Sequence, residues 1–267
     1  MTVVEKLKNN VAEVNSAFQN IKSKIASYGV EVGENTRPIE LAPKVNAVYE
    51  AGKKSEYDAF WDDYQKNGTR TNYDEGFAGV GWTSKTFKPK YSIVPNTAYM
   101  IFRDNQAGID LVDYCEKNGI TVDFSQVTNA RYAFYNAAFT HLGVLDFSKI
   151  VHASELIGIF NWCGAKTVDL LKLSATEGSY SSTFTSWGAL ENITIEGSIS
   201  CNGASFAQST KLTKASITSI VNALSATTSG FTITLSKTAV TTAFGSTESA
   251  EWNALIAPKS NWTISLV

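Results

Sequence analysis

The chain has 267 residues, of which 43% are hydrophobic, 12% aromatic and 18% charged, and its formal net charge is −2. This length and apolar content allow a sizeable buried core in one or two domains. The slight negative charge and the lack of long lysine and arginine runs argue against nucleic acid as a partner. No apolar stretch is long enough to insert into a membrane, and the first residues lack the apolar core of a cleaved secretory leader.

The cysteines predict neither a disulfide framework nor a zinc site, because their number is odd and no CxxC pair occurs. We expect small buried residues at all three positions and no cofactor. The three positions are Cys115, Cys163 and Cys201.

Apolar residues near the start of the chain alternate at spacings of three and four, which is the pattern of a coiled-coil helix. β-Branched residues at the d positions favour three or more strands, so we expect a homotrimer. The alternative is one amphipathic helix that packs on its own domain. Gly29 is the predicted helix end. The expected oligomerisation residues are Val4, Leu7, Val11, Val14, Phe18, Ile21 and Ile25.

A second short amphipathic helix is expected around residues 39–48, with Pro43 limiting its N-terminal extent. Gly52 and the two following lysines predict a hinge, so we place the boundary of an oligomerisation and attachment segment at residue 54.

Residues 55–118 are rich in aromatic side chains, with ten of them between positions 57 and 99. Such a cluster is expected to form a cap that closes the end of an elongated core. The alternative is a contact platform for a carbohydrate or a protein, in which Trp61 and Trp82 are the candidate binding residues.

A short pattern of apolar residues, Leu190-x-x-Ile193-x-Ile195, returns along residues 119–217. The last residues of successive copies lie 23, 26, 22 and 22 positions apart, which is typical of leucine-rich-repeat solenoids. The pattern predicts short stacked strands whose alternate side chains point inward. Its other copies end at Phe124, Phe147, Leu173 and Ile217.

A second periodic series supports the repeat, since phenylalanines recur at steps of 26, 24 and 22 residues. We expect these four residues, Phe134, Phe160, Phe184 and Phe206, to fill the space between stacked coils. Residues 218–267 depart from the repeat spacing. Their pattern predicts a C-terminal cap with a helix, two strands of alternating apolar residues and a further helix between these strands. The expected fold is therefore α+β, with an N-terminal coiled-coil helix and a short leucine-rich-repeat-like solenoid between capping elements.

The segments "LGVLDFSKIVHASELIGIFNWCGAKTV" and "LENITIEGSISCNGASFAQSTKLTKASI" resemble the irregular leucine-rich repeats of bacterial surface proteins. The resemblance is clearest in Phe160-x-x-Cys163 and in Phe206-x-x-Ser209-x-x-Leu212. The closing segment "FTITLS…SAEWNALIAPKSNWTISLV" is similar to the ends of such proteins in gut bacteria and their phages. The front segment "FQNIKSKIASYGVEVGENTRPIELAPKVNAVYEAG" resembles the start of phage and prophage tail or baseplate proteins. The resemblance implies a binding protein without catalytic residues.

Catalytic motifs are absent from the sequence, which holds no nucleophile elbow, phosphate loop or zinc-protease helix. His141 and His152 are expected to be surface or structural residues. Asp123 and Asp146 occupy equivalent repeat positions, and paired carboxylates in principle serve glycoside hydrolysis. Repetition explains this pair equally well, so we do not expect an enzyme.

The predicted function is that of a phage or prophage tail-associated protein, in a fibre, a receptor-binding device or a baseplate, located in the virion tail. Its expected partners are further copies of itself and a host-surface glycan or protein, or neighbouring tail proteins. One alternative is a bacterial cell-surface leucine-rich-repeat adhesin, and another is a carbohydrate-active enzyme on a solenoid scaffold. The predicted binding residues on the outward strand face are Asp123, Asp146, Lys172, Thr194 and Ser216.

Overall fold

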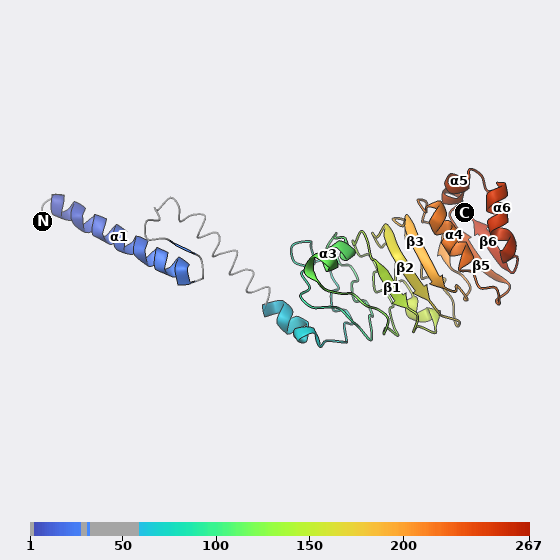
Figure 1. The fold of residues 1–267 in the computed structure, drawn as a ribbon, viewed down its shortest axis with the longest axis horizontal. Helices are drawn as coiled ribbons and strands as arrows, with labels where there is room; N and C mark the ends of the chain where they lie inside the picture. Colours follow the sequence, from blue (N-terminus) through green and yellow to red (C-terminus); the bar gives the residue numbers. More distant parts are fainter. Residues whose placement is uncertain (1–2, 28–30, 33–58) are drawn as a thin grey trace. The chain divides into compact units, whose positions relative to one another are not determined.

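The structure is a computed structural model that describes residues 3–27, 31–32 and 59–267. The chain divides into two compact units, residues 1–64 and 65–267, and each is described by itself (Figure 1). The expected helix at 39–48, the helix end at Gly29 and the boundary at residue 54 lie outside the described residues.

The first unit contains helix α1 (Val3–Ser27), which confirms the helix predicted from the heptad pattern. Its apolar stripe is largely in solvent in the single chain. The exposed fractions of Val11, Val14 and Ile21 are 54%, 68% and 47%, while Ile25 is buried. Phe18 is half-buried beneath the Lys22 ammonium, which lies 5.5 Å from the ring centre. The side chains of Val4 and Leu7 lie outside the described part of the structure.

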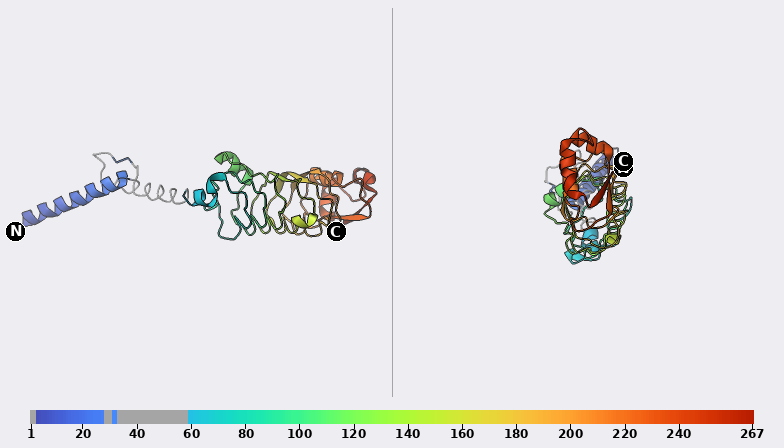
Figure 2. Two further views of the ribbon diagram at one scale, coloured as in Figure 1. Left: turned by 90° about the horizontal axis from the view of Figure 1, so that it is seen from below. Right: turned by 90° about the vertical axis from the view of Figure 1, so that its right-hand side faces the viewer.

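The strands of the second unit form two separate parallel sheets of three strands each, in the orders β1-β2-β3 and β4-β5-β6. Successive segments of this unit lie side by side (Figure 2), in agreement with the parallel register of the strands. The strands are β1 (Val144–Phe147), β2 (Thr167–Leu173), β3 (Asn192–Gly197), β4 (Ser205–Phe206), β5 (Phe231–Leu235) and β6 (Trp262–Leu266).

The helices of the second unit begin at side chains that accept a backbone N–H from the first turn, a role filled by Asp110, Thr213, Ser236 and Ser249. These residues cap α3 (Leu111–Asn118), α4 (Lys214–Asn222), α5 (Lys237–Phe244) and α6 (Ala250–Ile256). Short 3₁₀ turns lie at η1 (Lys66–Gly68), η2 (Ala153–Leu156) and η3 (Ala257–Lys259). The helices and strands predicted after residue 217 are confirmed by α4, α6, β5 and β6.

The expected leucine-rich-repeat-like solenoid is wrong, because the described residues form a mixed α/β structure in which the five repeat motifs do not build one sheet. The motif at residues 119–124 makes a single bridge between Val122 and Ile93 in place of a strand. The motif at residues 212–217 runs into α4, since Thr213 caps a helix there and Ile217, Ile220 and Val221 are buried at helical spacing. This helix also crosses the boundary expected at residue 217.

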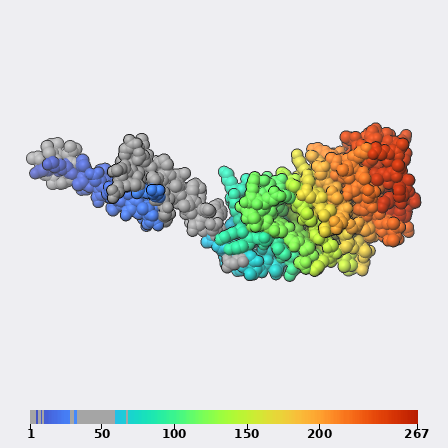
Figure 3. All heavy atoms as spheres, in the orientation of Figure 1, coloured from blue at the N-terminus to red at the C-terminus, as the bar shows by residue number. Residues whose placement is uncertain are grey.

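The periodic phenylalanines do stack in the core of the second unit. Their ring centres lie 5.9 Å apart between Phe134 and Phe160, 6.1 Å between Phe160 and Phe184, and 4.6 Å between Phe184 and Phe206. The series extends towards the N-terminus through Phe102 and Phe77, at 5.3 Å and 5.4 Å. Side chains fill the space between the ribbons of this unit (Figure 3). We refer to these six residues as the phenylalanine ladder.

The cysteines are free thiols, and two of the three are buried as expected. Burial raises the pKa of Cys163 to about 12, so this thiol is protonated at neutral pH and inert as a nucleophile. Cys201 donates from its sulfur to the carbonyl oxygen of Ala175 at 3.4 Å. Cys115 is half-buried in α3.

Candidate functional site

The outer face of the sheet β1-β2-β3 carries a row of alternating charges. Asp146 lies opposite Lys172 in the strand register, and Lys172 lies opposite Glu196. The Lys172 ammonium is 3.8 Å from the Asp146 carboxylate and 3.3 Å from the Glu196 carboxylate. Each carboxylate is therefore near a cation, so this row presents paired charges and not a field of one sign.

Asp123 and Asp146 share a structural role that explains their equivalent positions. Oδ1 of Asp123 accepts the backbone N–H of Ser125 at 2.8 Å, and Oδ1 of Asp146 accepts that of Ser148 at 3.0 Å. Such bonds turn the chain at the end of an extended segment. Burial acts to raise the pKa of Asp146, but the Ser148 hydrogen bonds and the Lys172 charge outweigh burial and lower it. A carboxylate with a lowered pKa stays ionised at neutral pH, which does not suit a general acid.

The register of β3 differs from the predicted one, because Lys172 lies opposite Glu196 and not opposite Thr194. β2 also has a bulge between Val168 and Leu171, where the backbone N–H groups of Asp169 and Leu170 both donate to the carbonyl oxygen of Gly143, at 3.0 and 3.4 Å. Across the bulge the offset between paired residues changes from 25 (Val168 with Ile193) to 24 (Leu171 with Ile195), whereas the repeat motif predicts 22. Glu196 was therefore missed as a member of the charged row, and the repeat spacing carries no signal of the bulge.

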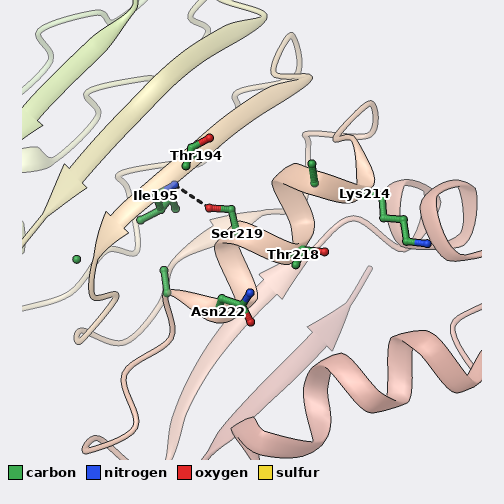
Figure 4. Close-up of a pocket in the computed structure, with 9 residues that line it drawn as sticks. Thr194, Ile195, Lys214, Thr218, Ser219 and Asn222 are labelled. Carbon is green, nitrogen blue, oxygen red and sulfur yellow. Dashed lines mark hydrogen bonds between the residues drawn. The ribbon is translucent and has the colours of Figure 1, made fainter.

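Ser216 does not face outward, since it is 2% exposed and lies in α4. Its hydroxyl accepts the backbone N–H of Ile193 at 2.9 Å. The hydroxyl of Ser219 accepts that of Ile195 at 2.8 Å (Figure 4). Residues three apart share one helix face, while N–H groups two apart share one strand edge, so α4 satisfies this edge of β3 with side chains. The two serines close the sheet in place of a further strand.

An open groove of about 830 Å³ runs between β3 and α4. Its walls carry hydroxyl, amide and small apolar groups, and the described residues that line it include no histidine or carboxylate. Lys214 is held at one end by an ion pair with Glu251 at 2.6 Å. This composition suits a ligand bound by hydrogen bonds and offers no nucleophile with an adjacent base. The lining residues are Thr194, Ile195, Gly197, Lys214, Ala215, Thr218, Ser219, Asn222 and Ala223 (Figure 4).

The two predicted tryptophans are not free contact surfaces. Trp61 in the first unit is 1% exposed and packs edge to face against Tyr64, with ring centres 5.7 Å apart. Trp82 in the second unit is half-buried, and its Nε1 donates to the carbonyl oxygen of Ala78 at 3.2 Å. Both indoles therefore have packing roles.

His141 lies between two carboxylates. Its Nε2 is 2.8 Å from Asp169, which the bulge turns towards it, and its Nδ1 is 3.3 Å from Asp110. Burial disfavours the imidazolium, but the hydrogen bonds and charges of Asp169 and Asp110 outweigh burial and raise the pKa of His141. The protonated ring donates from both nitrogens, so the group links three chain segments when it is charged.

We expect His141→Gln to destabilise the protein more at pH 5.5 than at pH 8.5, by up to about 1 kcal/mol. The raised pKa means that the stabilisation is complete below the unfolded-state pKa of about 6.5 and is lost as pH rises through the folded-state value. The measurement is urea unfolding at both pH values. His152→Gln is the control, because that exposed side chain meets a single exposed carboxylate, Glu177 at 3.2 Å. An equal loss for His141→Gln at the two pH values would contradict the assignment.

No group of three or more histidine, cysteine, aspartate or glutamate side chains suited to a metal ion occurs in residues 3–27 and 59–267. In the same part of the chain, no helix combines the length and apolar character needed to cross a bilayer.

Comparison with family models, with curated proteins and with solved structures finds no match.

Proposed function

We propose that this chain is a self-associating binding protein of a phage or prophage tail. Helix α1 joins the copies, and the unit of residues 65–267 presents the binding surface to a host-surface or neighbouring tail component. The single observation that carries the proposal is the apolar stripe of α1, where Val11, Val14 and Ile21 are about half or more exposed in the single chain.

We expect further copies of α1 to bury this apolar stripe in a helical bundle. The stripe is narrow and keeps the heptad spacing, which matches the seam of a coiled coil more closely than the wider face of a core-facing helix. Val14 and Ile21 are β-branched residues at d positions, and this choice favours three strands over a parallel pair. Three weak binding surfaces on one bundle gain avidity through their effective concentration. The resemblance of residues 18–52 to tail and baseplate proteins supports the location.

Light scattering after size exclusion tests the proposal on the full chain. We expect a mass near three times 29.0 kDa for the wild type and 29.0 kDa for the double variant Val14→Asp with Ile21→Asp. Two aspartates in the seam leave charges buried without partners in the assembly, which costs several kcal/mol per copy. Circular dichroism checks that the body of each variant stays folded.

The matched control is Ser16→Asp with Ser23→Asp, which adds the same two charges at exposed positions on the opposite face of α1. This variant should keep the wild-type mass. A wild-type chain that is monomeric at tens of micromolar refutes the proposal, and so does a double seam variant that keeps the oligomeric mass.

A further inference from the structure

A column of left-handed backbone positions runs through the second unit. Each lies two residues after a member of the phenylalanine ladder, and φ ranges from +50° to +108° at Gly79, Asp104, Asn136, Trp162 and Ser186. Glycine, asparagine and aspartate adopt this conformation at low cost, whereas a bulky side chain there is an outlier. Trp162, with φ of +56°, is therefore held in a strained conformation.

The Trp162 side chain is also 59% exposed. Its ring lies edge to face against Tyr135, with centres 5.0 Å apart and planes at 87°. Its backbone N–H donates to the carbonyl oxygen of Ser186 at 3.1 Å, while the indole Nε1 makes no hydrogen bond within the described part of the chain. A side chain that bears backbone strain and stays mostly in water contributes little to folding, so an indole at this place points to binding.

Tyr132, like Trp162, is an aromatic residue with a left-handed backbone conformation, and its φ is +57°. Its ring centre lies 5.7 Å from that of Tyr135. Gly158 leaves room for it, because a Cβ at that position would come within 2.5 Å of the Tyr132 ring. Tyr132, Tyr135 and Trp162 thus form one contiguous surface, which we refer to as the aromatic platform.

Polar groups with balanced charge adjoin the platform. The Arg103 guanidinium lies 5.6 Å from the Tyr135 ring centre and pairs with Asp104 at 3.3 Å. The side-chain amide of Asn136 donates to Asp104 at 2.8 Å. Because Arg103 and Asp104 offset each other, the surroundings favour an uncharged ligand that is rich in hydrogen-bonding groups.

We infer that the aromatic platform binds a neutral pyranose unit of a glycan, either a hexose or an N-acetylhexosamine. The C–H face of a pyranose ring packs on the exposed indole, and its hydroxyls meet the polar groups beside it. The surface is too small for a protein partner: an aromatic side chain buries about 150–250 Å², the three here are already partly buried, and a stable protein interface needs about 800 Å² per partner. The inference deepens the proposed function by naming a ligand class, and it rests on that function in taking residues 65–267 as the binding part.

The test is titration of the full chain with three neutral trisaccharides, chitotriose, maltotriose and cellotriose. Binding is detected by tryptophan fluorescence and by saturation-transfer difference NMR. We expect at least one of them to bind with Kd on the order of 1 mM. Trp162→Asn should weaken this binding at least tenfold, because the stacking surface is lost. Its Tm should change by less than about 4 °C, since asparagine tolerates the left-handed backbone and relieves the strain.

Val151→Ala is the control, because it truncates an exposed apolar side chain (51%) outside the platform, and it should bind as the wild type does. The inference is overturned if none of the three sugars binds, if a heparin oligosaccharide binds in their place, or if Trp162→Asn keeps its affinity or unfolds. The monomeric Val14→Asp with Ile21→Asp variant should retain the wild-type affinity per site. Failure of self-association is therefore seen separately from failure of sugar binding.

Discussion

Replacing Phe160 by alanine is expected to lower the free energy of unfolding by about 3–5 kcal/mol. Phe160 is 1% exposed and lies at the middle of the phenylalanine ladder. Its ring stacks on Phe134 and Phe184 and lies 4.1 Å from the ring centre of Trp187. Truncation removes the apolar surface and leaves a cavity between large rings whose positions are set by their own neighbours, so the site collapses only in part.

Urea unfolding monitored by circular dichroism measures this loss. Domains of ordinary stability have about 5–15 kcal/mol to lose, so the variant should unfold at a much lower urea concentration. Val151→Ala serves as the reference here as well, because a change at an exposed position away from special features costs within about 0.5 kcal/mol. A loss below about 1 kcal/mol for Phe160→Ala would show that the ladder is not a main source of stability.

Replacing Gly197 by alanine is expected to cost about 2–4 kcal/mol, although it adds one methyl group. Gly197 ends β3 opposite Leu173, with φ of +94°. A Cβ at this position would lie 2.0 Å from the carbonyl oxygen of Leu173 and 3.1 Å from its carbonyl carbon. Both atoms belong to the backbone of β2, so the clash is relieved only if the two strands separate at this end.

Gly230→Ala isolates the contribution of the clash. Gly230 also has a positive φ, of +71°, but a Cβ there meets nothing within 4 Å. Its replacement should cost about 1 kcal/mol, which is the conformational penalty alone. Urea unfolding of both variants gives the difference. Equal losses would mean that the strand pair adjusts at little cost, and the close approach of β2 and β3 would then carry no special constraint.

Local periodicity was sufficient to predict several elements. The heptad spacing predicted α1, and the alternation in residues 231–235 and 262–266 predicted β5 and β6. The recurrence of phenylalanine predicted the stacking of Phe134, Phe160, Phe184 and Phe206. These predictions succeed because each depends on which face of an element is apolar. The spacing of apolar residues that are close together in the chain determines that face.

The pairing of strands depends on distant segments, and here the predictions failed. Residues 212–217 carry a strand-like apolar pattern, yet Thr213 caps a helix, and the serines of that helix satisfy the edge of β3. The observed register of β2 against β3 places Lys172 opposite Glu196, two residues from the predicted Thr194. A repeat motif indicates which side chains of a strand point inward, but it does not show which backbone N–H and C=O groups form hydrogen bonds with each other. The motif therefore predicted one solenoid where two short sheets form.

The same distinction between local and distant contacts applies to the candidate sites. The sequence by itself determined the apolar stripe of α1 as a candidate surface, because a seam of one helix is a local property. The sequence also holds a signal for Trp162: the residue two positions after each ladder phenylalanine is small or polar except at this position. Only the tertiary structure decided that Ser216 is buried, that Trp61 is packed, and that Trp162 lies strained and exposed beside Tyr135. Burial and backbone conformation are set by neighbours about 25 residues away, and no local pattern encodes them.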